Sequence, residues 1–219
     1  RNEKGNIEAA IKRIPAFCKD MEILYVEGGS SDGTMEEINR VIGKYPKKDI
    51  KVLVQKGKGK GDAVRLGFGK ARGEVLMILD ADLTMPPEDL PKFFEALASG
   101  QGEFINGSRL VYPMEDDAMR FLNLAANKVF SWLFTWLLNQ RFTDTLCGTK
   151  VLRKSDYEMI SKNRGYFGDF DPFGDFDLIF GAAKLNLKIA EVPVRYEARL
   201  YGKPQISRFR DGWQLLRMV

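Results

Sequence analysis

Histidine is missing from this chain of 219 residues, and cysteine occurs only twice. The absence of histidine excludes His-based catalytic triads, His zinc sites and imidazole acid–base chemistry. Any catalysis must therefore use carboxylates, Lys or Arg, or a bound metal ion. Cys18 and Cys147 are far apart and have no metal-binding or redox spacing, which favours a reducing cytosolic compartment.

A strong net charge and a long apolar run are also missing. The net charge is only +4, which does not by itself indicate nucleic-acid binding, and we expect no nucleic-acid partner. The mainly apolar stretch 129–138, which has no charged residue, is near half of the roughly 20 residues that a bilayer span needs. No signal peptide is visible. With 44% hydrophobic residues, residues 1–219 are expected to form one globular domain.

Short apolar segments alternate with helical patterns in the first half of the chain. Segments 22–26, 50–54 and 75–79 are typical of strands, and 34–40 and about 62–71 of helices. This order predicts an α/β fold with a mostly parallel central sheet flanked by helices. After residue 110 the pattern is mixed, with two helical regions and a strand at 188–195. The chain starts without Met and stops inside a helical pattern, so we interpret it as truncated at both ends, with its first strand missing.

Two carboxylates, Asp80 and Asp82, directly follow the apolar segment 75–79. Open α/β sheets bind ligands beyond the carboxyl ends of their strands. Paired carboxylate oxygens suit a hard divalent cation such as Mg²⁺ or Mn²⁺, which would also hold a substrate diphosphate. An isolated Asp pair is better explained as a cap of the following turn, so the motif needs support from the rest of the chain.

Two glycine-rich turns lead into helices. Lys and Gly alternate over 56–61, but this segment fits neither the P-loop nor the dinucleotide template. Alone it is typical of a solvated basic loop, although its position before a helix would let backbone N–H groups and lysines approach an anion. In the other turn, Asp32-Gly33-Thr34 is ambiguous and is typical of a turn and helix N-cap. Glu27, at the tip of a strand, is the better candidate for a ligand contact.

These motifs and several later ones follow one another in a fixed order. They are Asn2-Glu3, Glu27 to Thr34, Gly59 to Ala63, Asp80-Ala81-Asp82, Gly107-Ser108-Arg109, Asp144 to Gly148, Glu191 to Pro193 and Arg199 to Gly202. This order and spacing resembles family 2 glycosyltransferases, in particular the dolichol-phosphate (polyprenyl-phosphate) mannose synthase branch. The resemblance implies a Rossmann-like GT-A fold and a metal-dependent inverting enzyme. Such an enzyme would move a sugar from GDP-mannose or a UDP-sugar to a polyprenyl or dolichyl phosphate.

The resemblance also implies roles for individual residues. Positions that contact the nucleotide are Glu3, Val26 and Glu27, and positions at the metal and diphosphate are Asp80, Ala81 and Asp82, with Asp80 and Asp82 as the metal ligands. Cationic positions for donor and acceptor phosphates are Arg109, Arg120 and Arg199, because a guanidinium fork matches phosphate oxygens. Asp82 and Arg199 are expected to act in catalysis.

Three departures from the family pattern stand out. Gly28 follows Glu27 where most relatives carry a second acid. Thr84 stands two residues after the Asp pair, where a Gln or Ser is common, and is a poorer metal ligand. Gln205 occupies the place of a family lysine, and Lys203 is the substitute that would reach the same phosphate.

Two kinds of acceptor are open. A lipid phosphate is already an anion, so no general base is needed, whereas a hydroxyl acceptor needs a carboxylate base. By position, Asp175 resembles the catalytic acid residue of hydroxyl-glycosylating relatives, and Asp177 the acidic residue of polyprenyl-phosphate relatives. Capping or solvation explains Asp169 and Asp171, and Asp144 is either an acceptor-loop residue or a loop cap. We interpret Lys150 and Arg153 as surface charges.

The apolar segment 121–138 is expected to be a helix that does not cross a bilayer. Its tryptophans, phenylalanines and Lys128 suit an interfacial helix, while packing on the core or in a dimer is an equal alternative. With the family resemblance, this predicts a peripheral protein at the cytoplasmic face of a membrane. A non-catalytic binding module and a nucleotidyltransferase are further alternatives.

Overall fold

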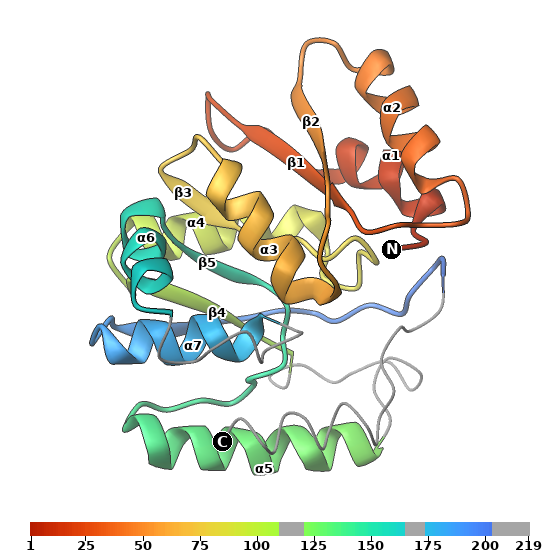
Figure 1. Ribbon diagram of the computed structural model, residues 1–219. Coiled ribbons are helices and arrows are strands. Elements are labelled where there is room, and N and C mark those ends of the chain that lie inside the picture. The colour runs from red at the N-terminus through yellow and green to blue at the C-terminus, as the bar shows by residue number, and fades with distance from the viewer. Residues whose placement is uncertain (110–120, 165–173, 203–219) are drawn as a thin grey trace.

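The computed structural model describes residues 1–109, 121–164 and 174–202, with residues 121–126 described without their side chains (Figure 1). The helices are α1 (Lys4–Arg13), α2 (Thr34–Lys44), α3 (Gly59–Lys70), the short 3₁₀ helix η1 (Pro87–Asp89), α4 (Leu90–Ala98), α5 (Phe121–Leu138), α6 (Lys154–Lys162) and α7 (Asp175–Lys184). The strands are β1 (Glu22–Glu27), β2 (Asp49–Val54), β3 (Val75–Met77), β4 (Phe104–Ser108), β5 (Lys150–Arg153) and β6 (Ile189–Pro193).

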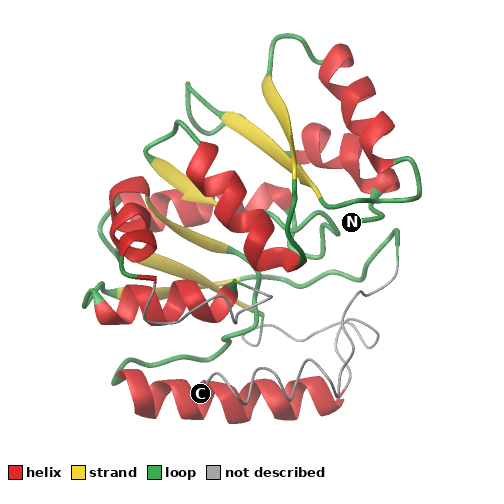
Figure 2. Ribbon diagram, in the orientation of Figure 1, coloured by secondary structure: helices red, strands yellow, loops and turns green. Residues whose placement is uncertain are grey.

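The strands form two sheets (Figure 2). β1 and β2 pair in parallel, with Glu22 opposite Asp49. The second sheet has the order β3-β5-β4-β6, in which β4 and β6 are parallel and β5 is antiparallel to both β3 and β4. β3, β4 and β6 therefore run in one direction. This confirms the expected α/β class, with one reversed strand inside the sheet.

Strand β5 was not predicted, and the surface assignment of Lys150 is wrong. The Lys150 side chain is completely buried, whereas Arg153, at the other end of the strand, is exposed. Only Val151 and Leu152 are apolar in this strand of four residues, so its sequence gives little strand signal. The pairing with two neighbouring strands stabilises it instead.

The predicted helix at 62–71 begins earlier than expected. α3 starts at Gly59, so the last residues of the Lys/Gly segment form its first turn rather than a loop. The strand at 75–79 is shorter, because regular pairing ends at Met77, although the Ile78 N–H still donates to the Lys150 carbonyl oxygen at 3.0 Å.

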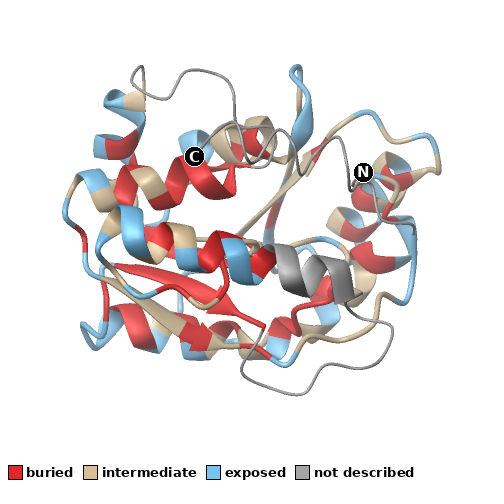
Figure 3. Ribbon diagram, turned by 90° about the horizontal axis from the view of Figure 1, so that it is seen from below, coloured by how far each residue is buried: buried red, intermediate tan, exposed pale blue. Residues whose placement is uncertain are grey.

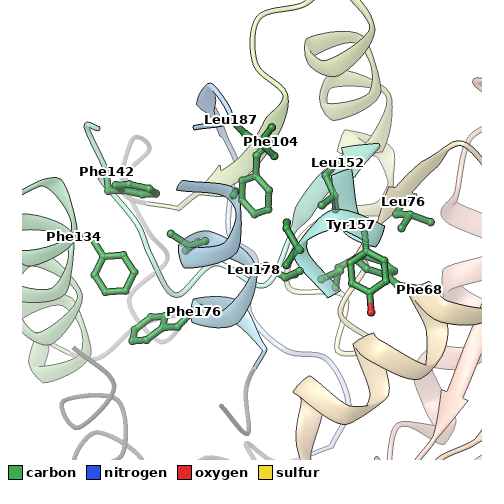
Figure 4. Close-up of a cluster of buried hydrophobic side chains, with 14 of the residues drawn as sticks. Phe68, Leu76, Phe104, Phe134, Phe142, Leu152, Tyr157, Phe176, Leu178 and Leu187 are labelled. Carbon is green, nitrogen blue, oxygen red and sulfur yellow. The ribbon is translucent and has the colours of Figure 1, made fainter. Parts of the chain in front are cut away.

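The two faces of the four-stranded sheet carry different apolar clusters. Phe104 and Leu152 belong to one cluster, and their neighbours Ile105 and Val151 to the other, as the alternation of side chains along a strand requires. The first cluster lies among the sheet, α3, α6, α7 and α5 (Figure 4), and the second packs against α4. A third cluster joins α1 and α2 to the small sheet through members such as Ile7 and Val41.

Helix α5 has one buried and one exposed side. Phe134 is fully buried and packs on Phe176 of α7, with ring centroids 4.6 Å apart. Trp132 and Trp136 are 70% and 73% exposed, and Figure 3 shows exposed and buried segments alternating along this helix. Core packing, one of the two alternatives for this helix, is thus confirmed for one face of residues 127–138, and Trp132 and Trp136 lie on the exposed face. Among the described helices, none combines the length and the hydropathy needed to cross a membrane.

Candidate functional site

The Asp80–Thr84 turn follows β3 and fixes the second carboxylate. The Leu83 N–H donates to the Asp80 carbonyl oxygen at 3.1 Å, with Leu83 in the left-handed region at φ +54°. The Thr84 N–H and hydroxyl both donate to Oδ1 of Asp82, at 3.2 and 2.8 Å. Thr84 is buried, so it orients Asp82 from behind and leaves the other carboxylate oxygen to face the site.

Arg199 links two other predicted site residues, Glu3 and Asp82. Its two terminal nitrogens donate to Oε1 of Glu3 and to Oδ2 of Asp82, each at 2.6 Å. Glu3 is buried and also accepts from Nδ2 of Asn6 at 2.7 Å. The guanidinium therefore bridges the start of α1 and the Asp80–Thr84 turn, although Glu3 and Asp82 are far apart in the sequence.

Lys60 forms an ion pair with Asp80, the other carboxylate of the Asp pair. Its Nζ lies 2.8 Å from Oδ1 of Asp80 and 3.8 Å from Oδ1 of Asp175. Burial alone would raise the pKa of Asp80, but the neighbouring charges of Lys60, Lys150 and Arg109 lower it. Asp80 is therefore a carboxylate anion in this site.

Gly148 allows the loop before β5 to approach Asp80 closely. A Cβ atom at Gly148 would lie 1.8 Å from Oδ2 of Asp80 and 2.3 Å from Nζ of Lys60. Real Cβ atoms do not make such contacts, so only glycine fits here without displacing the charged pair. The loop before β5 and the Asp80–Thr84 turn are therefore in close contact at Gly148 and Asp80.

Arg109 is engaged by a carboxylate of the protein. Its Nε and NH2 groups donate to Oδ2 and Oδ1 of Asp144, at 2.6 and 2.8 Å, and its backbone N–H donates to Oδ2 at 3.0 Å. Asn127 and the Leu146 N–H also donate to this carboxylate. Burial would raise the pKa of Asp144, but Arg109 and the other donors lower it to about 2. The pair fixes the loop that carries Gly148.

The other predicted residues that the structure describes have partners of their own. Glu27 is buried and accepts from the N–H groups of Gly29 and Ser30, at 2.9 and 2.6 Å, so it also holds its own loop. Val26 lies against Gly67 of α3, 3.3 Å from where a Cβ atom would stand, and Ala81 is exposed. Asp177 is buried and pairs with Arg164 at 2.8 Å. Arg120, Lys203, Asp169 and Asp171 lie outside the described residues.

A divalent cation fits the donor chemistry of the Asp80–Thr84 turn. Asp80 and Asp82 present oxygens only, both carboxylates are partly exposed, and both already meet cationic groups. The missing side chain at Gly148 lets the loop before β5 approach Asp80 without displacing its carboxylate. In residues 1–109, 121–164 and 174–202, no cluster of three or more His, Cys, Asp or Glu side chains is placed to hold a metal. Asp80 and Asp82 would need further oxygens from a ligand.

Two site residues escaped the sequence analysis. Lys60 was part of a segment typical of a solvated loop, and Lys150 was interpreted as a surface charge. The position of Lys60 before a helix gave a weak signal. Nothing local marks Lys150, because its partner Asp175 follows 25 residues later, at an Nζ–Oδ1 distance of 3.5 Å.

Comparisons with known proteins identify the family of this chain. Residues 1–159 match the model of the family described as glycosyl transferase family 2. A dolichol-phosphate mannosyltransferase of Pyrococcus furiosus is 40% identical over 112 residues, which cover 50% of this chain and 31% of that protein. The chain thus spans about a third of this relative's length.

Two solved structures share the fold. Glucosyl-3-phosphoglycerate synthase of Mycobacterium tuberculosis, solved with Mn²⁺ and UDP, is similar with a TM-score of 0.71 and 17% identity, over 99% of this chain and 75% of that one. A mannosyltransferase of Pyrobaculum calidifontis, solved with GDP-Man and Mn²⁺, gives a TM-score of 0.61 and 18% identity, over 99% and 58%. These likenesses confirm the expected GT-A type of α/β fold. With the family match over residues 1–159, they show that this chain belongs to glycosyl transferase family 2.

Proposed function

We propose that this chain transfers a sugar, with inversion, from a nucleotide-sugar to a polyprenyl or dolichyl phosphate, with the help of Mg²⁺ or Mn²⁺. The observation that carries the proposal is the alternation of charge around the Asp80–Thr84 turn. Asp82 holds Arg199 at 2.6 Å, and Asp80 holds Lys60 at 2.8 Å. Such a site offers carboxylates to a metal ion and cations to a diphosphate.

Donor binding would exchange these internal partners. When bound at Asp80 and Asp82, a divalent cation supplies electrostatic neutralisation of the leaving nucleoside diphosphate. The Arg199 guanidinium, once released from Asp82, is placed to donate to the diphosphate oxygens. The Mn²⁺ and nucleotides in the two similar structures support this choice of donor and metal. GDP-mannose and UDP-sugars are the donor candidates.

The transfer step needs no proton acceptor when the acceptor is a phosphate. An acceptor phosphate oxygen forms a bond to the anomeric carbon, and the bond from that carbon to the diphosphate oxygen breaks. The electron pair leaves with the nucleoside diphosphate, so the step is balanced without a proton transfer. The absence of histidine is therefore compatible with this reaction, and the lipid-linked name of the P. furiosus relative supports the acceptor class.

The exposed face of helix α5 supports a membrane-bound acceptor. Trp132 and Trp136 are exposed, and Lys128 is exposed beside them. Tryptophan with a nearby cation favours the headgroup region of a bilayer. We place the protein peripherally at the cytoplasmic face of a membrane, with α5 towards the lipid.

A donor and acceptor screen tests the proposal. The protein is incubated with radiolabelled GDP- or UDP-sugars, Mg²⁺ or Mn²⁺, and a polyprenyl phosphate. We expect label to enter the organic phase, and EDTA to abolish it. The matched control replaces the polyprenyl phosphate with the corresponding polyprenol. Equal transfer to the alcohol, or transfer only to soluble hydroxyl acceptors, would contradict the phosphate assignment.

A further inference from the structure

Lys150 is a cationic side chain in the interior of the protein, at 0% exposure. Its Nζ donates to the Cys147 carbonyl oxygen in the loop before β5 and lies 3.5 Å from Oδ1 of Asp175. A buried ammonium ion requires a nearby counter-charge, because transfer of an unpaired charge out of water is very unfavourable. Within the described part of the chain, Asp175 is the carboxylate at ion-pair distance from Lys150.

Asp175 also lies near Lys60, the lysine that pairs with Asp80. The same oxygen, Oδ1, lies 3.8 Å from Nζ of Lys60, whose ammonium group is 2.8 Å from Asp80. Asp175 is buried and opens α7, where the positive end of the helix dipole favours an anion. Its carboxylate therefore lies between two ammonium groups that serve two different segments.

Backbone packing holds the three segments together. Gly174, directly before Asp175, has φ +74°, and a Cβ atom there would stand 2.7 Å from the Cα of Gly61 in the first turn of α3. Gly148 makes the equivalent close approach to Asp80. The starts of α3 and α7 and the loop before β5 thus meet around the four charges of Asp80, Lys60, Asp175 and Lys150.

We propose that Asp175 is a positioning residue, which acts as the shared counter-charge of Lys150 and Lys60 and does not accept a proton from the acceptor. Through Lys150 it holds the loop before β5, and through Lys60 it sets the place of Asp80. This assigns to Asp175 a role other than the base of a hydroxyl-acceptor reaction. It also means that loss of activity in Asp175→Asn is no evidence for a base, because this change leaves Lys150 buried without its counter-charge.

A double-variant cycle separates the two roles. Asp175→Asn, Lys150→Met and the combination of both are compared with the unchanged chain. We expect each single change to lower Tm by about 6–20 °C, the range that follows from breaking a buried pair in a chain of this size. The combination should recover most of this loss, because it removes both charges at once. Asp156→Asn is the matched control, since Asp156 lies in the first turn of α6 and forms no ion pair with any residue that the structure describes, and it should leave Tm nearly unchanged.

Two further readouts decide between positioning and proton transfer. If Asp175 positions the site, Asp175→Asn lowers kcat/KM, but the acidic limb of its pH profile stays in place. Loss of the acidic limb would overturn the proposal. So would an Asp175→Asn protein with unchanged Tm.

Mn²⁺ binding, followed by electron paramagnetic resonance without any donor, keeps this test independent of the acceptor. We expect several-fold weaker binding in Asp175→Asn and in the combined variant, because Lys60 is left to Asp80 alone in both. The kcat/KM readout rests on the proposed function and the Mn²⁺ readout on its metal site, whereas the Tm readout rests on neither. Failure of the acceptor screen with a positive Tm cycle would reject the function and keep the positioning role.

Discussion

The Asp80–Thr84 turn and the loop before β5 each carry an arginine–aspartate pair, and the two pairs differ in kind. Arg199 reaches Asp82 with one nitrogen, and the side chains are 22% and 16% exposed. Arg109 grips Asp144 with two nitrogens and its backbone N–H, at 11% and 0% exposure. The first pair can exchange its partner for a ligand, whereas the second is part of the interior. The same two residue types therefore serve binding in one region and architecture in the other.

The loop pair gives the largest expected effect. Asp144→Asn leaves the buried Arg109 guanidinium without its counter-charge, so the free energy of unfolding should fall by about 3–5 kcal/mol. Urea denaturation followed by circular dichroism measures this. Asp20→Asn, at an exposed position, is the control and should change stability by less than about 0.5 kcal/mol. An Asp144 variant as stable as this control would show that the two pairs are alike.

The pair in the turn is expected to behave in the opposite way. Asp82→Asn should lower kcat/KM by about 10²–10³, the usual cost of losing one electrostatic contact to the transition state. Its free energy of unfolding should change by less than about 1 kcal/mol, because the pair is partly exposed. Steady-state kinetics and urea denaturation on one preparation give both numbers. A large loss of stability with little loss of activity would reverse the comparison.

The arginine–aspartate pair of the loop should also give a pH dependence of stability, which is a smaller effect than the two above. The pKa of Asp144 falls from its ordinary value of 3.8 to about 2 in the folded chain. A lowered pKa means that the stabilising contribution is complete above pH 4 and is lost as the pH falls towards 2. The contribution is on the order of 2 kcal/mol. The stability difference between the unchanged chain and Asp144→Asn, measured in urea from pH 6 to pH 3, should therefore shrink below pH 4. A difference that stays constant over this range would refute the ion pair as the source of the stability.

Conservative changes of the two arginines give the smallest expected effect. Arg199→Lys keeps the charge beside Asp82, so the free energy of unfolding should change by less than about 1 kcal/mol. Arg109→Lys loses the planar fork that Asp144 requires and should be the more destabilising of the two. Differential scanning calorimetry of both variants compares them directly. Equal losses would mean that neither site depends on guanidinium geometry.

The sequence predicted the elements whose residues carry a local signal. The apolar segments 22–26, 50–54 and 75–79 overlap β1, β2 and β3. Strand β5 was missed because two apolar residues between two cations do not distinguish a strand from a loop. Its identity depends on neighbours on both sides, and those pairings join residues far apart in the chain.

The candidate site also contains residues that the sequence identified and contacts that it did not reveal. Glu3, Asp82 and Arg199 were named from motif order, and the structure brings them into direct contact. Their assigned roles remain predictions. For Arg109, the motif suggested a phosphate contact, while the structure shows a buried carboxylate partner 35 residues away. Such long-range pairs are decided by packing, and spacing along the chain does not reveal them.

Helix α5 has a consequence beyond the position of its tryptophans. Phe130 and Phe134 complete the aromatic cluster on the face opposite Trp132 and Trp136. Outward movement of α5 would remove Phe130 and Phe134 from the core and leave a cavity there. A membrane or protein that binds Trp132 and Trp136 would therefore meet a helix of fixed orientation. The angle of α5 on that surface would set the angle of the core that is packed against it.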